Sequence, residues 1–259
     1  MMVIINADDF GFDADTAKAT IDCFQRGVLT SASIMANMPA TREAANFARA
    51  HPEFSFGVHL TYTWTTTEHP VMEARSIPSL VGNDGRFLTA NRLRLAAIRG
   101  QVTVADIIQE TSAQLGLIRD YGISISHVDS HCHLHKFSPF LEALRQVLPR
   151  FGIRRVRCLQ NVYLHIPIAR PVFWLTYGSS ATLRRTFLTT DYMYMPASSG
   201  DYGWPKVIQR KLKRKGVLEV GIHPGCREIW RRREVEEAQR FAALCLVSNC
   251  KLITWQGVE

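Results

Sequence analysis

The densest group of metal-binding residue types lies in the stretch HVDSHCHLH, residues 127–135. Four histidines and one aspartate alternate there with other residues. In an extended chain, alternate side chains point to the same face, so all five ionisable groups would share one face. Burying them without partners would be costly, whereas imidazoles beside a carboxylate suit a divalent metal. The stretch predicts a metal site, and a solvated strand face is the alternative.

An acidic pair, Asp8 and Asp9, follows the short apolar run at residues 3–6. Neighbouring side chains diverge at a strand end, so one carboxylate can face a metal while the other faces a bound water. A divalent ion acidifies such a water, in the best zinc cases to a pKa near ~7, and a free carboxylate can take the proton. The pair therefore indicates hydrolysis, although two adjacent aspartates can also simply cap a turn.

Two single histidines occupy comparable positions in the sequence. His59 lies near the end of the apolar run at residues 54–60, and His223 follows the run at residues 217–222. Taken alone, each is more typical of a structural histidine. The recurrence of polar residues after apolar runs favours function, because sites in parallel β/α folds form at the carboxyl ends of strands. His223 could supply a proton to a departing nitrogen.

The elements that would position these residues alternate along the chain, which predicts a parallel α/β sheet or barrel. A length of 259 residues suits one β/α barrel, which typically needs roughly 250, and no linker or repeat divides the chain. We expect a single domain over residues 1–259, with loop insertions near residues 62–100 and 161–205. The predicted strands cover residues 3–6, 30–36, 54–60, 124–131, 155–159, 217–222 and 251–255.

The formal net charge is +8, and most of the excess lies in the second half of the chain. Solvated helix faces are the simpler interpretation, and attraction to a polyanion or an anionic membrane surface is the alternative. No nucleic-acid motif accompanies the charge, so we expect no nucleic-acid partner. Scattered cysteines without a C-x-x-C pair, and no secretory signal or bilayer-length apolar run, favour a cytoplasmic protein, with peripheral membrane contact as the alternative.

Four motifs together resemble the YdjC-like carbohydrate deacetylases, a family that includes chitooligosaccharide deacetylases and a branch associated with hopanoid lipid synthesis. They are NADDFG at residues 6–11, GVHL at 57–60, HVDSHCHLH at 127–135 and HPG at 223–225. The first and third are specific in combination. The resemblance implies a distorted, TIM-like β/α barrel of the glycoside hydrolase/deacetylase type. It also implies hydrolysis of the acetyl group of an N-acetylated sugar.

The resemblance further implies one divalent metal and a role for each of eight residues. Magnesium is the ion common in the family, while two imidazoles and one carboxylate would also suit zinc or another transition ion. Family members are often dimers, so a homodimer is implied as well. The assignments are metal ligation by Asp9, His59 and His131, general base catalysis by Asp8, general acid catalysis by His223, and lining of the site or orientation of its ligands by Asp129, His133 and His135.

Some features leave alternatives open. Cys226 follows the HPG motif where an aromatic residue is common in the family, which affects the expected shape of the sugar pocket. Trp174, Tyr192 and Trp204 are candidates for stacking on a sugar. An H-x-H pair at residues 131–133 could instead hold two metals in another amidohydrolase or a phosphoesterase. A non-enzymatic metal-binding or polyanion-binding protein is the third interpretation.

Overall fold

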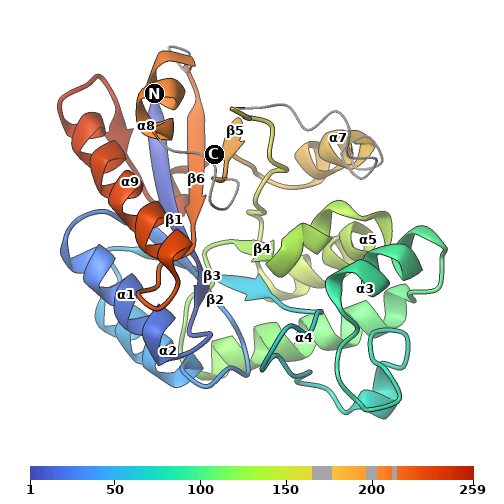
Figure 1. Ribbon diagram of the computed structural model, residues 1–259. Helices are drawn as coiled ribbons and strands as arrows, with labels where there is room; N and C mark the ends of the chain where they lie inside the picture. Colours follow the sequence, from blue (N-terminus) through green and yellow to red (C-terminus); the bar gives the residue numbers. More distant parts are fainter. Residues whose placement is uncertain (165–176, 197–202, 212–214) are drawn as a thin grey trace.

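The computed structural model describes residues 1–164, 177–196, 203–211 and 215–259 (Figure 1). Strands and helices alternate along most of this chain, as the sequence predicts. The strands are β1 (Met2–Phe10), β2 (Ser31–Ile34), β3 (Ser55–Leu60), β4 (Val128–Ser130), β5 (Tyr192–Tyr194), β6 (Val217–Ile222) and β7 (Lys251–Leu252). The helices are α1 (Ala14–Gln25), α2 (Thr41–Ala50), α3 (Ala90–Ile98), α4 (Val104–Asp120), α5 (Ser138–Val147), α7 (Tyr177–Thr186), α8 (Trp204–Lys211) and α9 (Ile229–Leu246), with short 3-10 turns at η1 (Ala74–Ser76), η2 (His131–Lys136), η3 (Leu148–Phe151) and η4 (Trp255–Gly257).

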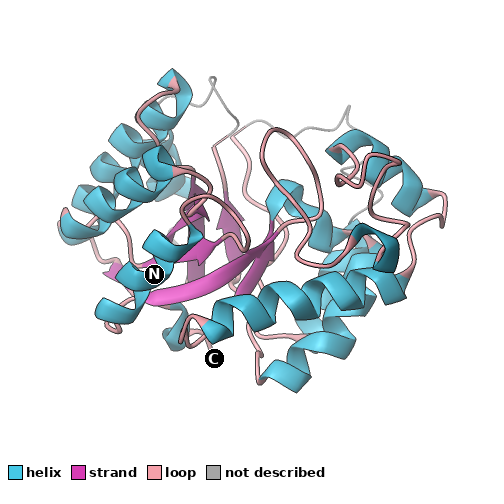
Figure 2. Cartoon of the chain, turned by 90° about the horizontal axis from the view of Figure 1, so that it is seen from below, coloured by secondary structure: helices cyan, strands magenta, loops and turns pink. Residues whose placement is uncertain are grey.

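The described strands form one sheet in the order β4-β3-β2-β1-β6-β5, and β7 also pairs with β1. Every strand pair is parallel. The sheet curls into a half-barrel with helices packed around its outside (Figure 2). After its first residue β1 is buried along its whole length, as expected for a parallel strand covered on both faces. Because the strands are parallel, their carboxyl ends meet at the same edge.

Backbone hydrogen bonds extend the curl beyond β4. The Val128 N–H donates to the Arg155 carbonyl, and the Arg157 N–H donates back to the Val128 carbonyl, both at 3.0 Å. Val156 in turn donates to the Leu188 carbonyl at 3.0 Å. The strand predicted at residues 155–159 is therefore present only as isolated bridges at Arg155 and Val156. These bridges carry the chain from β4 toward the segment that leads into β5.

The turn that follows β1 is fixed by a helix cap. Asp13 accepts a hydrogen bond from the Thr16 N–H at 2.8 Å, and the Asp13 N–H donates to the Thr16 hydroxyl at 3.1 Å. This reciprocal capping box satisfies N–H groups that the first turn of α1 leaves free. The cap at Asp13 sets the direction in which the chain leaves Asp8 and Asp9.

Two predictions about local structure were wrong. The strand predicted at residues 124–131 is only Val128–Ser130, because the chain enters η2 at His131. The five ionisable side chains of residues 127–135 therefore do not share one face. In addition, the stretch at residues 161–205 contributes β5 to the sheet, whereas we predicted a surface insertion. Three residues of strand are too few to give a recognisable alternation of polar and apolar side chains.

The excursion at residues 62–100 has structure of its own. It contains η1 and α3, and an antiparallel bridge joins Val81 to Phe87. Leu80, Phe87 and Leu93 are buried, so the excursion packs onto the rest of the molecule. Among the described residues, no helix is both long enough and apolar enough to span a bilayer.

Candidate active site

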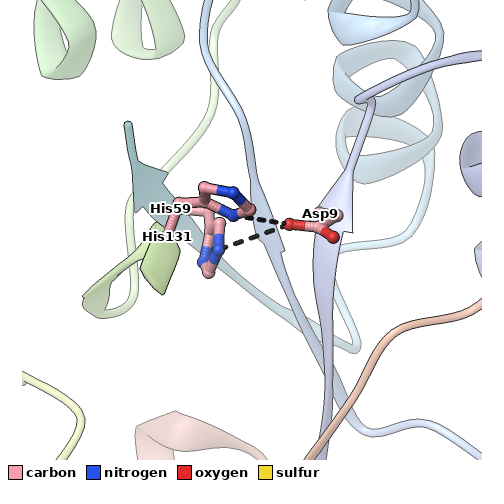
Figure 3. Close-up of side chains that lie close together, drawn as sticks. All are labelled: Asp9, His59 and His131. Carbon is pink, nitrogen blue, oxygen red and sulfur yellow. Dashed lines mark hydrogen bonds and ion pairs between the residues drawn. The ribbon is translucent and has the colours of Figure 1, made fainter. Parts of the chain in front are cut away.

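Three predicted metal ligands converge at the carboxyl edge of the sheet (Figure 3). Asp9 comes from β1, His59 from β3, and His131 directly follows β4. The Asp9 Oδ1 atom lies 3.1 Å from His131 Nδ1 and 3.5 Å from His59 Nε2. One ligand atom from each residue lies within 4.8 Å of the other two. Residues far apart in the sequence are thus brought together as the sequence predicted.

The chemistry of this donor set fits a divalent cation. Two imidazole nitrogens and one carboxylate oxygen are typical of catalytic metal sites that keep positions open for water or substrate. Asp9 and His59 are almost completely buried, and His131 keeps 18% of its side chain exposed. The site therefore combines a rigid, dry side with access from solvent at His131.

An irregularity in β1 explains how two neighbouring aspartates both reach this region. In a regular strand, Asp8 and Asp9 would point to opposite faces of the sheet. The register of β1 against β2 shifts between Ala7 and Phe10, and Asp9 has a left-handed backbone with a φ of 58°. Such bulges turn a side chain away from its regular direction and are frequent beside active sites. The bulge lets Asp9 face the two imidazoles while Asp8 stays inside the half-barrel.

The second strained segment follows His131. Cys132 and His133 have φ values of 56° and 54°, in the left-handed region that residues other than glycine rarely adopt. Strained residues of this kind cost on the order of 1–3 kcal/mol each and cluster at functional sites. The Arg94 guanidinium donates to the Cys132 carbonyl at 3.0 Å, which helps to hold this kink. The kink redirects the chain immediately after the candidate ligand.

Asp129 orients His59. Its Oδ1 atom lies 2.8 Å from His59 Nδ1, so the Nε2 atom of the ring is the one that faces Asp9. Asp129 is fully buried. Burial alone would raise the pKa of Asp129, but Arg157 and His59 hold it well below its usual range. A charged carboxylate is thus fixed behind one candidate ligand, the arrangement that orients metal-binding histidines in proteins.

Arg157 is a residue of the site that the sequence analysis missed. Its fully buried guanidinium bonds both oxygens of Asp8 at 2.6 Å, Asp129 Oδ2 at 2.7 Å and Glu219 Oε1 at 2.7 Å. The planar fork of arginine suits such bidentate pairing. The signal in the sequence was a charged residue inside a predicted strand, between Val156 and Cys158. The solvated-face interpretation of the basic second half of the chain does not hold for this residue.

Asp8 lies beside the three candidate ligands rather than among them. One ligand atom each from Asp8, His59 and Asp129 lies within 4.8 Å of the other two. Besides the two bonds from Arg157, Asp8 Oδ1 accepts a hydrogen bond from Asn6 Nδ2 at 2.9 Å. The Asp8 carboxylate is therefore held in one orientation, next to the imidazole of His59.

Arg231 is a second residue of the site that the sequence analysis missed. The glycine of the HPG motif packs directly against it. The Arg231 Nη2 atom donates to Asp9 Oδ2 at 3.0 Å, and its Nη1 atom is buried without a hydrogen-bond partner among the described residues. A Cβ atom on Gly225 would lie 2.5 Å from the Arg231 Cδ atom. The glycine of the HPG motif thus makes room for the arginine that holds the second oxygen of Asp9.

His223 follows β6 and is paired with Glu234 of α9. The Glu234 Oε2 atom accepts a hydrogen bond from the His223 N–H at 2.8 Å and lies 3.1 Å from His223 Nδ1. Burial alone would lower the pKa of His223, but the neighbouring Glu234 carboxylate raises it to about 9. His223 therefore carries a positive charge at neutral pH and is able to donate a proton.

The other histidines of residues 127–135 have different surroundings. His127 stacks on Trp255 with ring centroids 4.5 Å apart, and a Cβ atom on Gly57 would lie 2.5 Å from the His127 ring. His135 Nδ1 lies 2.7 Å from the Ser130 hydroxyl, and burial lowers the pKa of His135 to about 3. These two histidines are packed into the structure around the site.

The H-x-H pair does not form a two-metal cluster in the part of the chain that the structure describes. His133 belongs to neither of the three-residue groups whose ligand atoms lie within 4.8 Å of one another. Its ring centroid lies 6.3 Å from that of His135, and its own backbone is part of the kink that follows His131. His133 and His135 thus do not join Asp9 and His59, and their role in lining the site or orienting its ligands stays a prediction.

The three aromatic candidates for sugar stacking occupy different positions. Trp204 is fully buried between Tyr194 and Phe241, with centroid distances of 5.2 and 5.1 Å, so it belongs to the core and the suggestion of sugar contact was wrong. Tyr192 is half-buried in β5. Trp174 lies outside the described residues.

The fold and the site define this protein as a curled, parallel β/α half-barrel with an Asp/His/His group at the carboxyl edge of its sheet. The chain matches the sequence profile of the YdjC-like protein family over residues 2–245 and belongs to that family. The family resemblance inferred from the four motifs is therefore confirmed.

Similar proteins agree with this assignment. Carbohydrate deacetylase from Geobacillus stearothermophilus is 37% identical over 183 residues, 70% of each chain. Carbohydrate deacetylase from Listeria monocytogenes serotype 4b (strain CLIP80459) is 32% identical over 227 residues, 86% of this chain and 81% of the relative. A crystal structure from Enterococcus faecalis V583, named for cellobiose-phosphate cleavage, has a TM-score of 0.79 at 23% identity and covers 98% of this chain and 97% of its own. That likeness confirms the distorted TIM-like barrel.

Replacing Arg157 tests its structural role. The variant Arg157→Leu leaves three buried carboxylates without their cation, and breaking buried ion pairs in this way typically costs about 3–5 kcal/mol. We expect the free energy of unfolding, measured by urea denaturation, to fall by that amount. Arg154→Leu, at an exposed position three residues earlier, is the matched control and should change it by less than about 0.5 kcal/mol. Equal stability of the two variants would contradict the role given to Arg157.

The charge of His223 can be tested through its partner. In Glu234→Gln the raising effect of that carboxylate is lost while burial remains, so the pKa of His223 should fall from about 9 toward its ordinary value, with Asp8 and Asp9 still opposing the effect of burial. NMR titration of the His223 ring protons measures this. Because the folded-state pKa is raised, the stabilisation from this pair is complete below pH ~6.5 and is lost as pH rises through about 9. Glu236→Gln, at an exposed position on α9, should leave both properties unchanged.

Proposed function

We propose that this protein is a metal-dependent carbohydrate deacetylase. It hydrolyses the acetyl group of an N-acetylglucosamine-type sugar, in an oligosaccharide or a glycolipid, to acetate and a free amine. The observation that carries the proposal is the convergence of Asp9, His59 and His131 with Asp8 and His223 nearby. The curated relatives named carbohydrate deacetylase support the reaction class.

Asp9, His59 and His131 are the residues that would hold the ion. A divalent cation bound there supplies a Lewis acid that polarises the acetyl carbonyl and acidifies water. Magnesium is the ion proposed from the family resemblance, and the two imidazole donors also suit zinc or another transition metal. Arg231, Asp129 and the strained turn after His131 hold the ligands in place before any ion arrives.

Asp8 is the proposed general base. A carboxylate offers about four lone-pair sites, and Arg157 and Asn6 take three of them on Asp8. The remaining site lies on Oδ2 and can accept the proton of an attacking water. As the water oxygen bonds to the acetyl carbon, that proton moves to Asp8, and Arg157 keeps the carboxylate from rotating away.

His223 is the proposed general acid. It is protonated at neutral pH and sits at the end of β6, on the same edge of the sheet as Asp8. When the carbon–nitrogen bond breaks, His223 gives its proton to the departing nitrogen, and Glu234 stabilises the charged ring beforehand. One water is consumed, and acetate and an amine leave. Asp8 then releases the proton that it took up to solvent and His223 takes up a proton from solvent, which restores the starting state.

Acetate release from N-acetylglucosamine, short chitooligosaccharides and an N-acetylated glycolipid tests this function. The protein should be assayed metal-free and then with magnesium, zinc, manganese or cobalt. Asp8→Asn removes the base, so we expect turnover to fall by roughly 10²–10⁴ while metal binding persists. Asp9→Asn should lose metal binding and activity together.

The control for this test is Asp120→Asn, at an exposed position at the end of α4. It should keep both properties. If Asp8→Asn kept wild-type turnover, or if no N-acetylated sugar yielded acetate with any of the ions, the proposed function would be overturned.

A further inference from the structure

Glu68, a buried carboxylate outside the predicted site residues, faces the candidate metal ligands. Glu68 lies in the excursion that follows β3 and has no exposed surface. Its Oε2 atom accepts hydrogen bonds from the backbone N–H groups of Thr65, Thr66 and Thr67 at 3.0, 2.8 and 3.0 Å. Its Oε1 atom is bonded by the Thr65 hydroxyl. Successive backbone N–H groups of this kind form an anion-binding nest, so the position of the carboxylate is fixed.

The Oε1 side of this carboxylate faces His131. The Glu68 Oε1 atom lies 3.9 Å from His131 Nε2, while the other ring nitrogen, Nδ1, lies 3.1 Å from Asp9. His131 therefore stands between two carboxylates. A closing movement of about one ångström would bring Glu68 within hydrogen-bond distance of His131 Nε2.

The same arrangement occurs at His59 with the nitrogens exchanged. There Nδ1 is bonded to Asp129, and Nε2 faces Asp9. In both imidazoles one nitrogen faces Asp9 and the other faces a buried carboxylate. Metal-binding histidines usually donate their second N–H to such a group, which fixes the tautomer and the orientation of the ring.

We infer that Glu68 is the positioning residue for His131: it holds the proton of that ring on Nε2 and leaves Nδ1 for the cation. The site then binds its ion through Nε2 of His59 and Nδ1 of His131. This inference rests on the proposed function for the presence of a metal. Glu68 acts through His131 and is not itself a ligand, because it joins neither described group whose ligand atoms lie within 4.8 Å.

Helix α4 fixes the chain on both sides of Glu68. Gln114 bonds both the N–H and the carbonyl of Thr61, at 2.9 and 2.6 Å. Glu110 accepts from the N–H groups of Val71 and Met72 at 2.9 and 3.0 Å. Both α4 side chains are buried and bonded to each other at 2.8 Å. The position of Glu68 is thus fixed by α4 as well as by the nest.

Glu68→Gln makes a sharp test, because the nest dictates how the amide must lie. Three N–H donors require an acceptor at the Oε2 position, so the glutamine oxygen takes that place and its NH₂ group faces His131 Nε2. Nε2 must then accept a hydrogen bond, which moves the ring proton to Nδ1, the nitrogen that the metal needs. We expect the zinc affinity, measured by calorimetry, to fall 10–100-fold. Glu73→Gln, an exposed glutamate in the same excursion, is the matched control and should keep wild-type affinity.

A direct readout is the nitrogen that binds. In the zinc-loaded wild-type protein, long-range ¹H–¹⁵N correlation spectra of labelled histidines should show His131 bound through Nδ1 and His59 through Nε2. Binding of His131 through Nε2, unchanged zinc affinity in Glu68→Gln, or a wild-type protein that binds no zinc would each overturn the inference. If both readouts come out as expected while no sugar is deacetylated, the positioning role stands and the proposed substrate class fails.

Discussion

One buried guanidinium holds the interior of the half-barrel together. Arg157 bonds Asp8, Asp129 and Glu219, and each of these carboxylates would be costly to bury alone. Burial raises the pKa of Glu219 to about 7 despite the bond from Arg157, so this group carries a proton during part of the neutral range. That proton reduces the excess of negative charge around a single cation. The orientation of Asp8 depends on Arg157 directly, and that of His59 depends on it through Asp129.

The buried contacts of Arg157 change the interpretation of the positive charge in the second half of the chain. A solvated surface remains a sound interpretation for exposed residues such as Arg154, in a loop, and Arg232, on α9. Arg157 and Arg231, however, also belong to the basic second half of the chain and are buried against carboxylates of the site. Part of the positive charge thus balances acidic groups inside the molecule. Sequence position alone could not separate the two kinds of arginine, since Asp9, which Arg231 bonds, and Asp8, which Arg157 bonds, lie 222 and 149 residues away from them.

The sequence allowed prediction of the features that depend on local pattern. Asp9, His59 and His223 follow apolar runs, and parallel strands bring such positions to one edge. The kink after His131 could not be predicted, because left-handed backbone at Cys132 and His133 is unfavourable locally and is held by tertiary contacts such as the bond from Arg94. The contacts of Arg157 and Arg231 with the two aspartates could not be predicted from local pattern either, because the partners are far apart in the sequence.

The meeting of side chains from β1 and β3 requires a small residue on the strand between them. Ser33 of β2 supplies it: its hydroxyl accepts a hydrogen bond from Asn6 Nδ2 at 3.0 Å and donates one to Asp129 Oδ2 at 3.0 Å. A larger side chain at this point would fill the space in which the polar groups meet. A hydroxyl also satisfies polar groups that an alanine would leave unpaired in a dry interior. Ser33 has no role in the proposed reaction itself. The site nevertheless depends on it, because Ser33 gives the reacting groups both room and hydrogen bonds.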